Sequence, residues 1–174
     1  MDKFVVDAGP FIHLDQIGQL QLLQKLPQLL LPTSVLHEIG ESHIKSALHN
    51  VHQWENVRMV SVEKRLIESF KTRFDRDILQ QGEIDCIALA LGIEGCILLT
   101  DDLKARVTAE GLGVEVHGSV GVIAYSAKRG WISIKTAESA FHSLYHQSNL
   151  FVTFAIIENA MQNLRKSIST EPPK

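Results

Sequence analysis

The sequence has few of the features that mark secreted or membrane-spanning proteins. It has only two cysteines, Cys86 and Cys96, too few for a disulfide framework or a zinc cluster, and both lie in apolar runs. We therefore expect buried thiols in a reducing cytoplasm. No apolar stretch approaches the roughly 18–20 uncharged residues that span a bilayer. Asp7 comes too early for the apolar region of a signal peptide, so we expect neither secretion nor insertion into a membrane.

The chain also lacks a strong positive charge and several well-known catalytic motifs. Its net charge of −3 argues against coating nucleic acid through bulk charge, so a role on nucleic acid needs a local basic patch. Neither GxxxxGK[ST] nor GxGxxG follows a strand, and neither GxSxG nor HExxH occurs. These absences remove the support for a nucleotide cofactor, a serine hydrolase of that type or a zinc protease.

Short apolar runs alternate with amphipathic segments from residue 3 to about residue 130. This alternation is typical of an α/β fold with a mainly parallel sheet. The predicted strands are 3–6, 28–32, 57–62, 96–100 and 114–118. The predicted helices are 11–26 with a break near Gly18, a helix with Pro32 at its first position, 43–54, 82–92 and 102–111; a charged segment at 63–77 is given no element. Beyond residue 135 only helices are predicted, roughly 136–147 and 150–167, and we expect them to pack on the sheet domain.

Acidic residues follow or open several of these elements. They are Asp7 after the first strand, Glu38 in the helix after the second, Glu83 and Asp85 at the start of the helix at 82–92, and Asp101 and Asp102 after the strand at 96–100. In a parallel α/β sheet, ligands bind at the carboxyl ends of the strands. Acids from four segments of the chain can therefore converge at one edge of the sheet.

Converging carboxylates need a cation. Carboxylates crowded within about 4–6 Å repel one another and raise some of their pKa values unless a cation lies among them. Mg²⁺ and Mn²⁺ are hard ions that prefer oxygen ligands, and they can activate a water molecule and neutralise charge on a phosphoryl group.

Each acid taken alone also has a structural interpretation. Asp101 or Asp102 can be the N-cap of the helix that follows, and Glu38 can be a solvated helix residue. Glu83 and Asp85 can complement the dipole of their helix.

Four short motifs in order resemble the PIN-domain family, metal-dependent ribonucleases that include VapC-like toxins. The motifs are VVDAGPFI, LPTSVLHEIG, GEIDCIALALG and ILLTDD, and a basic helix and a Gly-Val/Leu-Gly loop, here Gly-Leu-Gly at 111–113, follow the double aspartate. The resemblance covers about residues 3–134 and is weaker through the C-terminal helices. It implies a PIN-like three-layer α/β/α sandwich. We expect a nuclease domain at 1–135, a helical extension at 136–168 and a disordered tail at 169–174.

The resemblance also implies which acids form the site. It assigns catalysis and the binding of Mg²⁺ or Mn²⁺ to Asp7, Glu38, Asp85 and Asp102. Thr100 matches a threonine that commonly orients the fourth acid.

Two pairs of acids leave a choice. On a helical wheel, Glu83 and Asp85 fall on opposite flanks of one apolar stripe, so they cannot point the same way, and the wheel does not choose between them. The family pattern favours Asp85, with Glu83 as an outer acid. It likewise favours Asp102 at the metal, with Asp101 as the helix cap or an outer acid.

An RNA substrate needs cations close to the acids, because phosphate contacts supply much of the affinity. The candidates are Lys104 and Arg106 on the helix after Asp102, and Lys45 beyond Glu38. The resemblance further implies two protein partners, a small antitoxin that blocks the acid cleft and a second copy of the chain in a homodimer.

One position departs from the family pattern. Many members carry Ser or Asn two residues after the first Asp, and this chain has Gly9. The alternative function is therefore a PIN-like domain that no longer cuts and acts as a binding or regulatory module. A phosphatase-like hydrolase with Asp7 as nucleophile would need a second Asp at position 9, so it is disfavoured.

Overall fold

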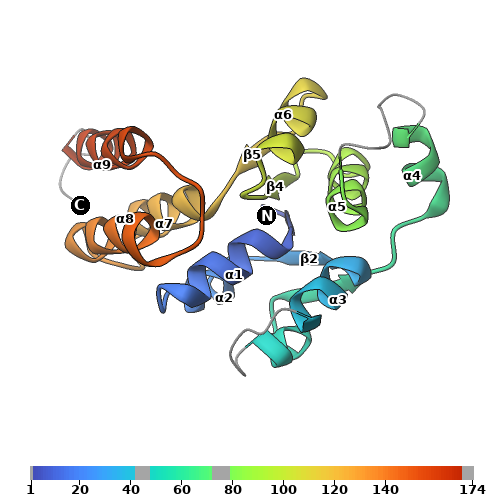
Figure 1. Cartoon of the computed structure of the whole chain (residues 1–174), viewed down its shortest axis with the longest axis horizontal. Coiled ribbons are helices and arrows are strands. Elements are labelled where there is room, and N and C mark those ends of the chain that lie inside the picture. Colours follow the sequence, from blue (N-terminus) through green and yellow to red (C-terminus); the bar gives the residue numbers. More distant parts are fainter. Residues whose placement is uncertain (1, 42–47, 72–78, 170–174) are drawn as a thin grey trace.

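Five short strands form a fully parallel sheet in the order β3-β2-β1-β4-β5, within the residues that the computed structural model describes: 2–41, 48–71 and 79–169 (Figure 1). The strands are Phe4–Val6 (β1), Leu29–Pro32 (β2), Val57–Val60 (β3), Ile97–Leu99 (β4) and Glu115–His117 (β5). The helices are Ala8–Gln16 (α1), Gln21–Gln24 (α2), Thr33–Glu41 (α3), Lys64–Lys71 (α4), Gln81–Leu91 (α5), Leu103–Gly111 (α6), Ser119–Lys128 (α7), Ile134–Gln147 (α8) and Phe154–Ser169 (α9), with a 3₁₀ helix at Leu48–Gln53 (η1). The predicted α/β/α sandwich is confirmed.

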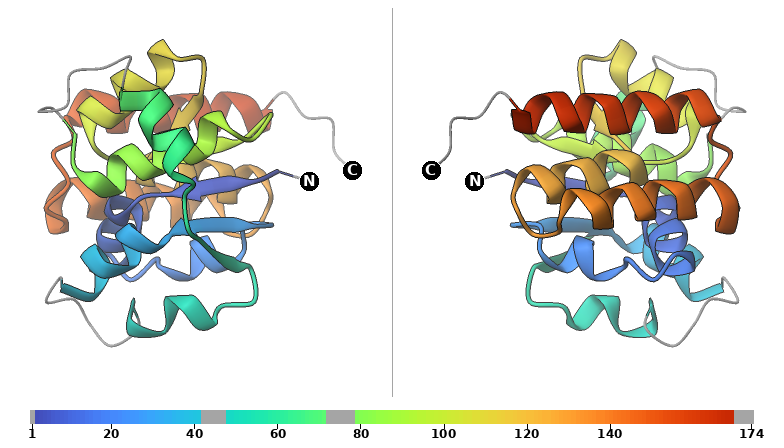
Figure 2. Two further views of the ribbon diagram at one scale, coloured as in Figure 1. Left: turned by 90° about the vertical axis from the view of Figure 1, so that its right-hand side faces the viewer. Right: turned by 90° about the vertical axis from the view of Figure 1, so that its left-hand side faces the viewer.

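The sheet extends from β1 in both directions. β2 and β3 lie on one side of β1, and β4 and β5 lie on the other. Because parallel crossovers are right-handed, connections that run in opposite directions place their helices on opposite faces. α1, α2 and α7 accordingly cover one face, while α5 and α6 cover the other, with α4 packed against α5 (Figures 1 and 2). The strand order reverses between β1 and β4, and such a reversal forms the crevice in which open α/β sheets bind ligands.

The central strands are apolar on both faces because helices cover both. Every residue of Phe4–Val6 and Leu29–Pro32 is buried. The edge strands β3 and β5 are only partly buried. The core thus fixes the register of β1 against β4, with Val6 opposite Leu99, and this register aligns the ends of the two strands.

The C-terminal helices form a further layer on α7. α8 and α9 pack on α7 and on each other, and the layer is visible at the left of Figure 1. Their inward residues Phe141, Leu144, Ile157 and Leu164 are buried. Among the described residues, no helix is both long enough and apolar enough to cross a membrane.

Several local predictions were wrong. Pro32 ends β2 and does not begin a helix, since α3 starts at Thr33. The charged segment contains α4, whose apolar residues Leu66, Ile67 and Phe70 pack against the core on one side of the helix. Of the helix predicted at 43–54, residues 43–47 lie outside the described part, and the remainder contains η1.

Candidate active site

A hydrogen bond at the ends of β1 and β4 joins Asp7 to Thr100, in the loop that carries Asp102. Asp7 directly follows β1, is only 5% exposed and caps α1, where its Oδ1 accepts from the Ala8 amide at 2.8 Å. Its Oδ2 accepts from the hydroxyl of Thr100, the residue after β4, at 2.8 Å. The same hydroxyl oxygen accepts from the amide of Asp102 at 3.2 Å. One threonine therefore fixes Asp7 relative to the start of α6.

Asp102 is the N-cap of α6, so the prediction that Asp101 caps this helix was wrong. The Oδ1 of Asp102 accepts from the Ala105 amide at 2.8 Å. Asp7 and Asp102 thus both lie at helix N-termini, where the helix dipole favours negative charge.

Asp101 instead joins three elements beside the site. Its Oδ1 accepts from the amide of Ser119, the first residue of α7, at 2.7 Å, and its Oδ2 accepts from the Ser119 hydroxyl at 2.6 Å. The same Oδ2 lies 2.7 Å from Nδ1 of His13 on α1, and the Asp101 side chain is 6% exposed. His13 and Ser119 were not predicted as site residues, because only the folded sheet brings them to Asp101.

The packing of Asp101 explains why this chain has glycine at position 9. A Cβ at position 9 would lie 3.1 Å from the Cβ of Asp101 and 3.6 Å from its Oδ2. His13 is one turn further along the same face of α1. The missing side chain therefore makes room for Asp101, which Gly9 and His13 contact from adjacent turns.

Glu83 faces acids from three other elements. Its pKa is raised from 4.5 to about 7, mainly by burial and in smaller part by the nearby charges of Asp102, Asp7 and Glu38. The Oε2 of Glu83 accepts from the Gln80 amide at 2.8 Å, a capping-box interaction at the start of α5. Glu83 therefore takes part in capping α5, and its pKa also depends on the charges of Asp7 and Asp102 at the ends of β1 and β4.

Asp85 has a different environment. It is 8% exposed, its Oδ2 accepts from the Ser34 hydroxyl at 2.6 Å, and its Oδ1 accepts from the Gln81 amide at 2.6 Å. Both oxygens thus accept from uncharged donors: Ser34 joins Asp85 to α3, and Gln81 lies one turn earlier on α5 itself.

Glu38 approaches the same region from α3. A Cβ at position 82 would lie 2.9 Å from Cδ of Glu38, so Gly82 leaves the space that this carboxylate occupies. The charges of Asp7, Asp85, Glu38 and Glu83 all raise the pKa of the Cys86 thiol, after the larger effect of its complete burial. The acids from separate segments therefore surround this thiol.

We call Asp7, Glu38, Glu83 and Asp102 the acid cluster. Burial raises the pKa of Asp7, and the charges of Asp102 and Asp101 raise it further. Clustered carboxylate oxygens are the donors that Mg²⁺ and Mn²⁺ prefer, so the donor set fits such an ion. In the described part of the chain, no three histidine, cysteine or acidic side chains already form a group ready to hold a metal.

The predicted phosphate contacts differ from one another. Lys104 is exposed on the first turn of α6. Arg106 donates to the carbonyls of Thr100 at 3.1 Å and Val116 at 3.2 Å, so its guanidinium holds the ends of β4 and β5 together. Lys45 lies outside the described residues.

Substitution of Asp101 should lower the stability of the fold more than substitution of its neighbour Asp102. Asp101→Ala should lower the free energy of unfolding by about 3 kcal/mol, because it leaves buried donors of Ser119 and His13 unpaired. Asp102→Ala removes one helix cap and should cost about 1 kcal/mol. Urea denaturation at pH 7 measures both values. Equal losses in the two variants would contradict the structural role assigned to Asp101.

The raised pKa of Glu83 gives a pH dependence. Between pH 4.5 and about 7 the folded chain binds a proton that the unfolded chain has released, so stability falls as pH rises through this window. Glu83→Gln retains an oxygen for the Gln80 amide and cannot ionise. Its melting temperature should therefore fall less than that of the wild type between pH 5 and pH 8, measured in EDTA. The exposed Glu94→Gln variant is the control and should follow the wild type; a Glu83→Gln variant that does the same would refute the shift.

The acid cluster at the strand reversal agrees with the result of sequence comparison. A sequence profile described as a PIN domain matches residues 3–166, which include the sheet, every acid discussed above and most of α9. No curated protein sequence matches the chain. PIN domains are generally nucleases that typically use divalent metal ions. The chain belongs to the PIN-domain family.

Proposed function

We propose that this chain is a Mg²⁺- or Mn²⁺-dependent endoribonuclease whose active site is the acid cluster. The observation that carries the proposal is that Thr100 joins Asp7 and Asp102 at the carboxyl ends of β1 and β4, beside Glu83, whose pKa is raised to about 7 by burial and by the neighbouring acids. A divalent cation stabilises neighbouring carboxylates, and a site of this composition at a strand reversal suits hydrolysis of phosphodiesters.

Each residue of the cluster has a separate task in this proposal. Asp7, Glu83, Asp102 and Glu38 would hold the ion, which when bound would activate a water molecule and neutralise charge on the phosphate. Thr100 keeps Asp7 in position through its 2.8 Å hydrogen bond. Asp85 holds α5 against α3 through Ser34, and its other oxygen accepts from Gln81 on α5, so we assign it a positioning task, in place of the ligand position that the family pattern favours.

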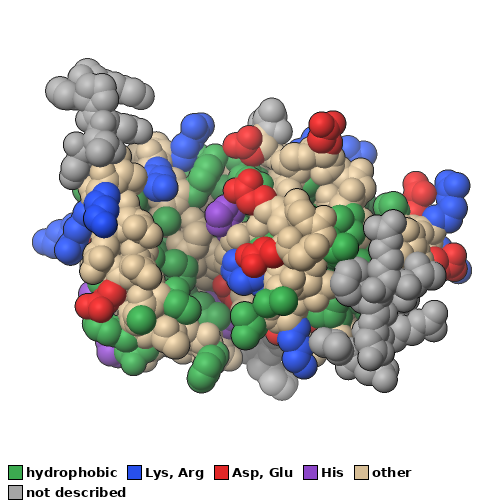
Figure 3. Space-filling view, turned by 90° about the horizontal axis from the view of Figure 1, so that it is seen from above, with side chains coloured by type: hydrophobic (Ala, Val, Ile, Leu, Met, Phe, Trp, Pro, Cys, Tyr) green, Lys and Arg blue, Asp and Glu red, His purple; other side chains and the backbone are tan. Residues whose placement is uncertain are grey.

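The RNA would meet its phosphate contacts at the start of α6. The five Lys or Arg residues between residues 128 and 166 lie away from the acids, because Lys128 and Arg129 are at the end of α7 and only its first residue, Ser119, contacts Asp101. In Figure 3, Lys and Arg side chains gather toward the end of the molecule that α8 and α9 form. Lys104 is the candidate phosphate contact closest to Asp102, and Arg106 would support the site by holding β4 to β5.

A toxin that an antitoxin silences is the biological setting we propose for this nuclease. Leu103 and Val107, one turn apart on α6 beside Asp102, are 70% and 61% exposed. An apolar surface at the rim of the acid cluster suits a protein partner that covers the site. The exposed Phe151 and Ile156 at the start of α9 suit the second copy of a homodimer. The cytoplasm remains the expected compartment.

Loss of cleavage on removal of one carboxylate tests the activity. Asp7→Asn and Asp102→Asn should each lower Mn²⁺-dependent cleavage of a fluorogenic single-stranded RNA by at least about 100-fold, because each removes a ligand. Asp102→Asn should melt no lower than the wild type, since its amide oxygen still accepts the bond of its helix cap. Asp7→Asn keeps its helix cap but replaces the oxygen that accepts from Thr100, so it should fold with a slightly lower melting temperature. Asp15→Asn, on the same helix as the Asp7 cap, is the control and should cleave normally.

A wild-type chain that neither cleaves RNA nor gains thermal stability with Mn²⁺ would overturn the proposal. That result would favour the alternative of a PIN-like binding or regulatory module.

The choice between the two acids of α5 has its own test. Glu83→Gln should weaken Mn²⁺ binding by about 10-fold or more, because it removes a carboxylate that faces Asp7 and Asp102. Asp85→Asn keeps the size of a side chain that faces Ser34 and Gln81, and should change Mn²⁺ affinity much less. Isothermal titration with Mn²⁺ at pH 7.5 measures both. The opposite order would return the ligand position to Asp85.

A further inference from the structure

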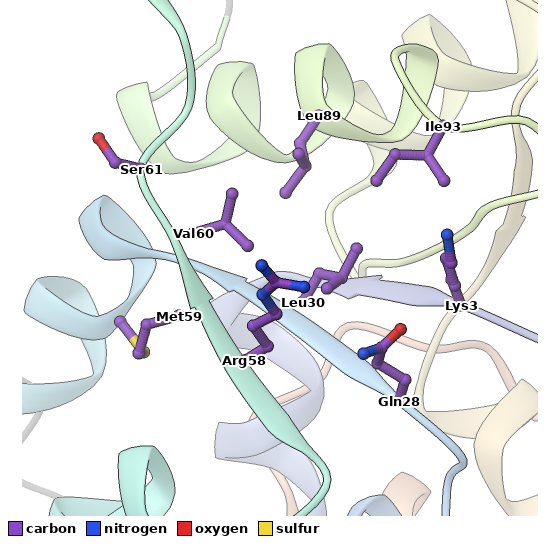
Figure 4. A pocket seen from close by; sticks show the side chains of 9 residues that line it. All are labelled: Lys3, Gln28, Leu30, Arg58, Met59, Val60, Ser61, Leu89 and Ile93. Atoms are coloured by element: carbon purple, nitrogen blue, oxygen red, sulfur yellow. The ribbon is translucent and has the colours of Figure 1, made fainter.

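A cavity opens between the sheet and α5, away from the acid cluster. Its volume is about 380 Å³, and it lies between the residues that precede β1 and β2, the length of β3 and the C-terminal part of α5 (Figure 4). Its lining runs from Lys3 and Gln28, before β1 and β2, to Ser61, directly after β3. The two sites do not share residues.

The register of the sheet explains which side chains enter this cavity. Val5 pairs with Leu30, and Leu30 pairs with Arg58, so these three residues form one row on one face of the sheet. Lys3 and Gln28 precede Val5 and Leu30 by two residues, and the alternation of a strand places them on the same face. Arg58 therefore stands at the outer end of a row that is apolar in the core.

The cavity combines cations with an apolar wall. Figure 4 shows the guanidinium of Arg58 and the amide of Gln28 on the sheet side, the ammonium of Lys3 at one end, and, facing them, Leu89 on α5 and Ile93 in the turn that follows α5. Arg58 and Lys3 are the charged residues among those that line the cavity, and both are cations in a chain of net charge −3.

The donors match one class of ligand. A guanidinium offers a planar pair of N–H donors to carboxylate or phosphate, and an ammonium adds a second positive charge. The apolar side chains Leu30, Leu89 and Ile93 can cover the non-polar part of the same molecule. We propose that this cavity binds a small anionic ligand, with its phosphate or carboxylate between Arg58 and Lys3 and its apolar body against α5.

A different explanation for Arg58 is that it protects the edge of the sheet from aggregation. Charged residues on an edge strand such as β3 prevent edge-to-edge pairing with other chains, and Arg58 alone would satisfy that need. It would not account for Lys3 and Gln28 on the same face or for the open space between them and α5.

The test uses small aromatic probes that differ in charge. The full chain, ¹⁵N-labelled and kept in EDTA, is titrated with 1-naphthyl phosphate, 1-naphthoate, inorganic phosphate and the uncharged 1-naphthol. We expect the two aromatic anions to shift the amide signals of Leu30, Arg58, Leu89 and Ile93. We expect 1-naphthol to bind at least about 10-fold more weakly. The stronger of the two anions then identifies the head group as phosphate or carboxylate.

Two substitutions remove the cations one at a time. Arg58→Gln and Lys3→Gln should each weaken binding of the better anion by about 10-fold, whereas the exposed Lys135→Gln on α8 should leave it unchanged. Lys3 lies before the first residue of β1, so Lys3→Gln should fold normally. It can therefore still test the proposal if Arg58→Gln fails to fold. Shifts confined to other surfaces, equal binding of 1-naphthol, or unchanged affinity in both cation variants would overturn the proposal.

Discussion

The hydrogen bond from Thr100 to Asp7 is the interaction on which the rest of the site depends. It spans β1 and β4, the strands between which the sheet reverses direction, and it is only 2.8 Å long. Because the register of β1 against β4 is fixed by buried apolar residues, the donor and acceptor need little further ordering. The same hydroxyl oxygen then accepts from the amide of Asp102, so one side chain sets the spacing of two acids that are 95 residues apart.

Electrostatic repulsion is the constraint that this arrangement has to overcome. Burial and neighbouring carboxylates raise the pKa values of both Asp7 and Glu83, which opposes the ionised state. The chain reduces the cost by placing Asp7 and Asp102 at helix N-termini and by giving each carboxylate at least one hydrogen bond from a backbone amide. A divalent cation would reverse the remaining penalty, which is why the same residues that strain the metal-free chain suit a metal-dependent nuclease.

The fold could be predicted from the sequence, whereas the choice between neighbouring acids could not. Alternating apolar and amphipathic segments predicted the parallel sheet, and Asp7 stood out because it directly follows a buried strand, while Asp102 was preferred to Asp101 only through the resemblance to the family. Glu83 and Asp85 could not be separated, since a helical wheel shows their divergence and not which side of α5 faces β1 and β4. The environment of Asp101 was also out of reach, because His13 and Ser119 are 88 and 18 residues away from it and meet it only in the folded chain.

The most direct test of the account is a crystal structure of the chain with Mn²⁺, with the ion located by its anomalous scattering. The account predicts a peak at the carboxyl ends of β1 and β4, about 2.1–2.3 Å from oxygens of Asp7, Glu83 and Asp102. Asp101 should still be bound to Ser119 and His13, and Asp85 to Ser34 and Gln81. A peak that Asp85 or Asp101 coordinates in place of Glu83 or Asp102, or no peak at this edge of the sheet, would contradict it.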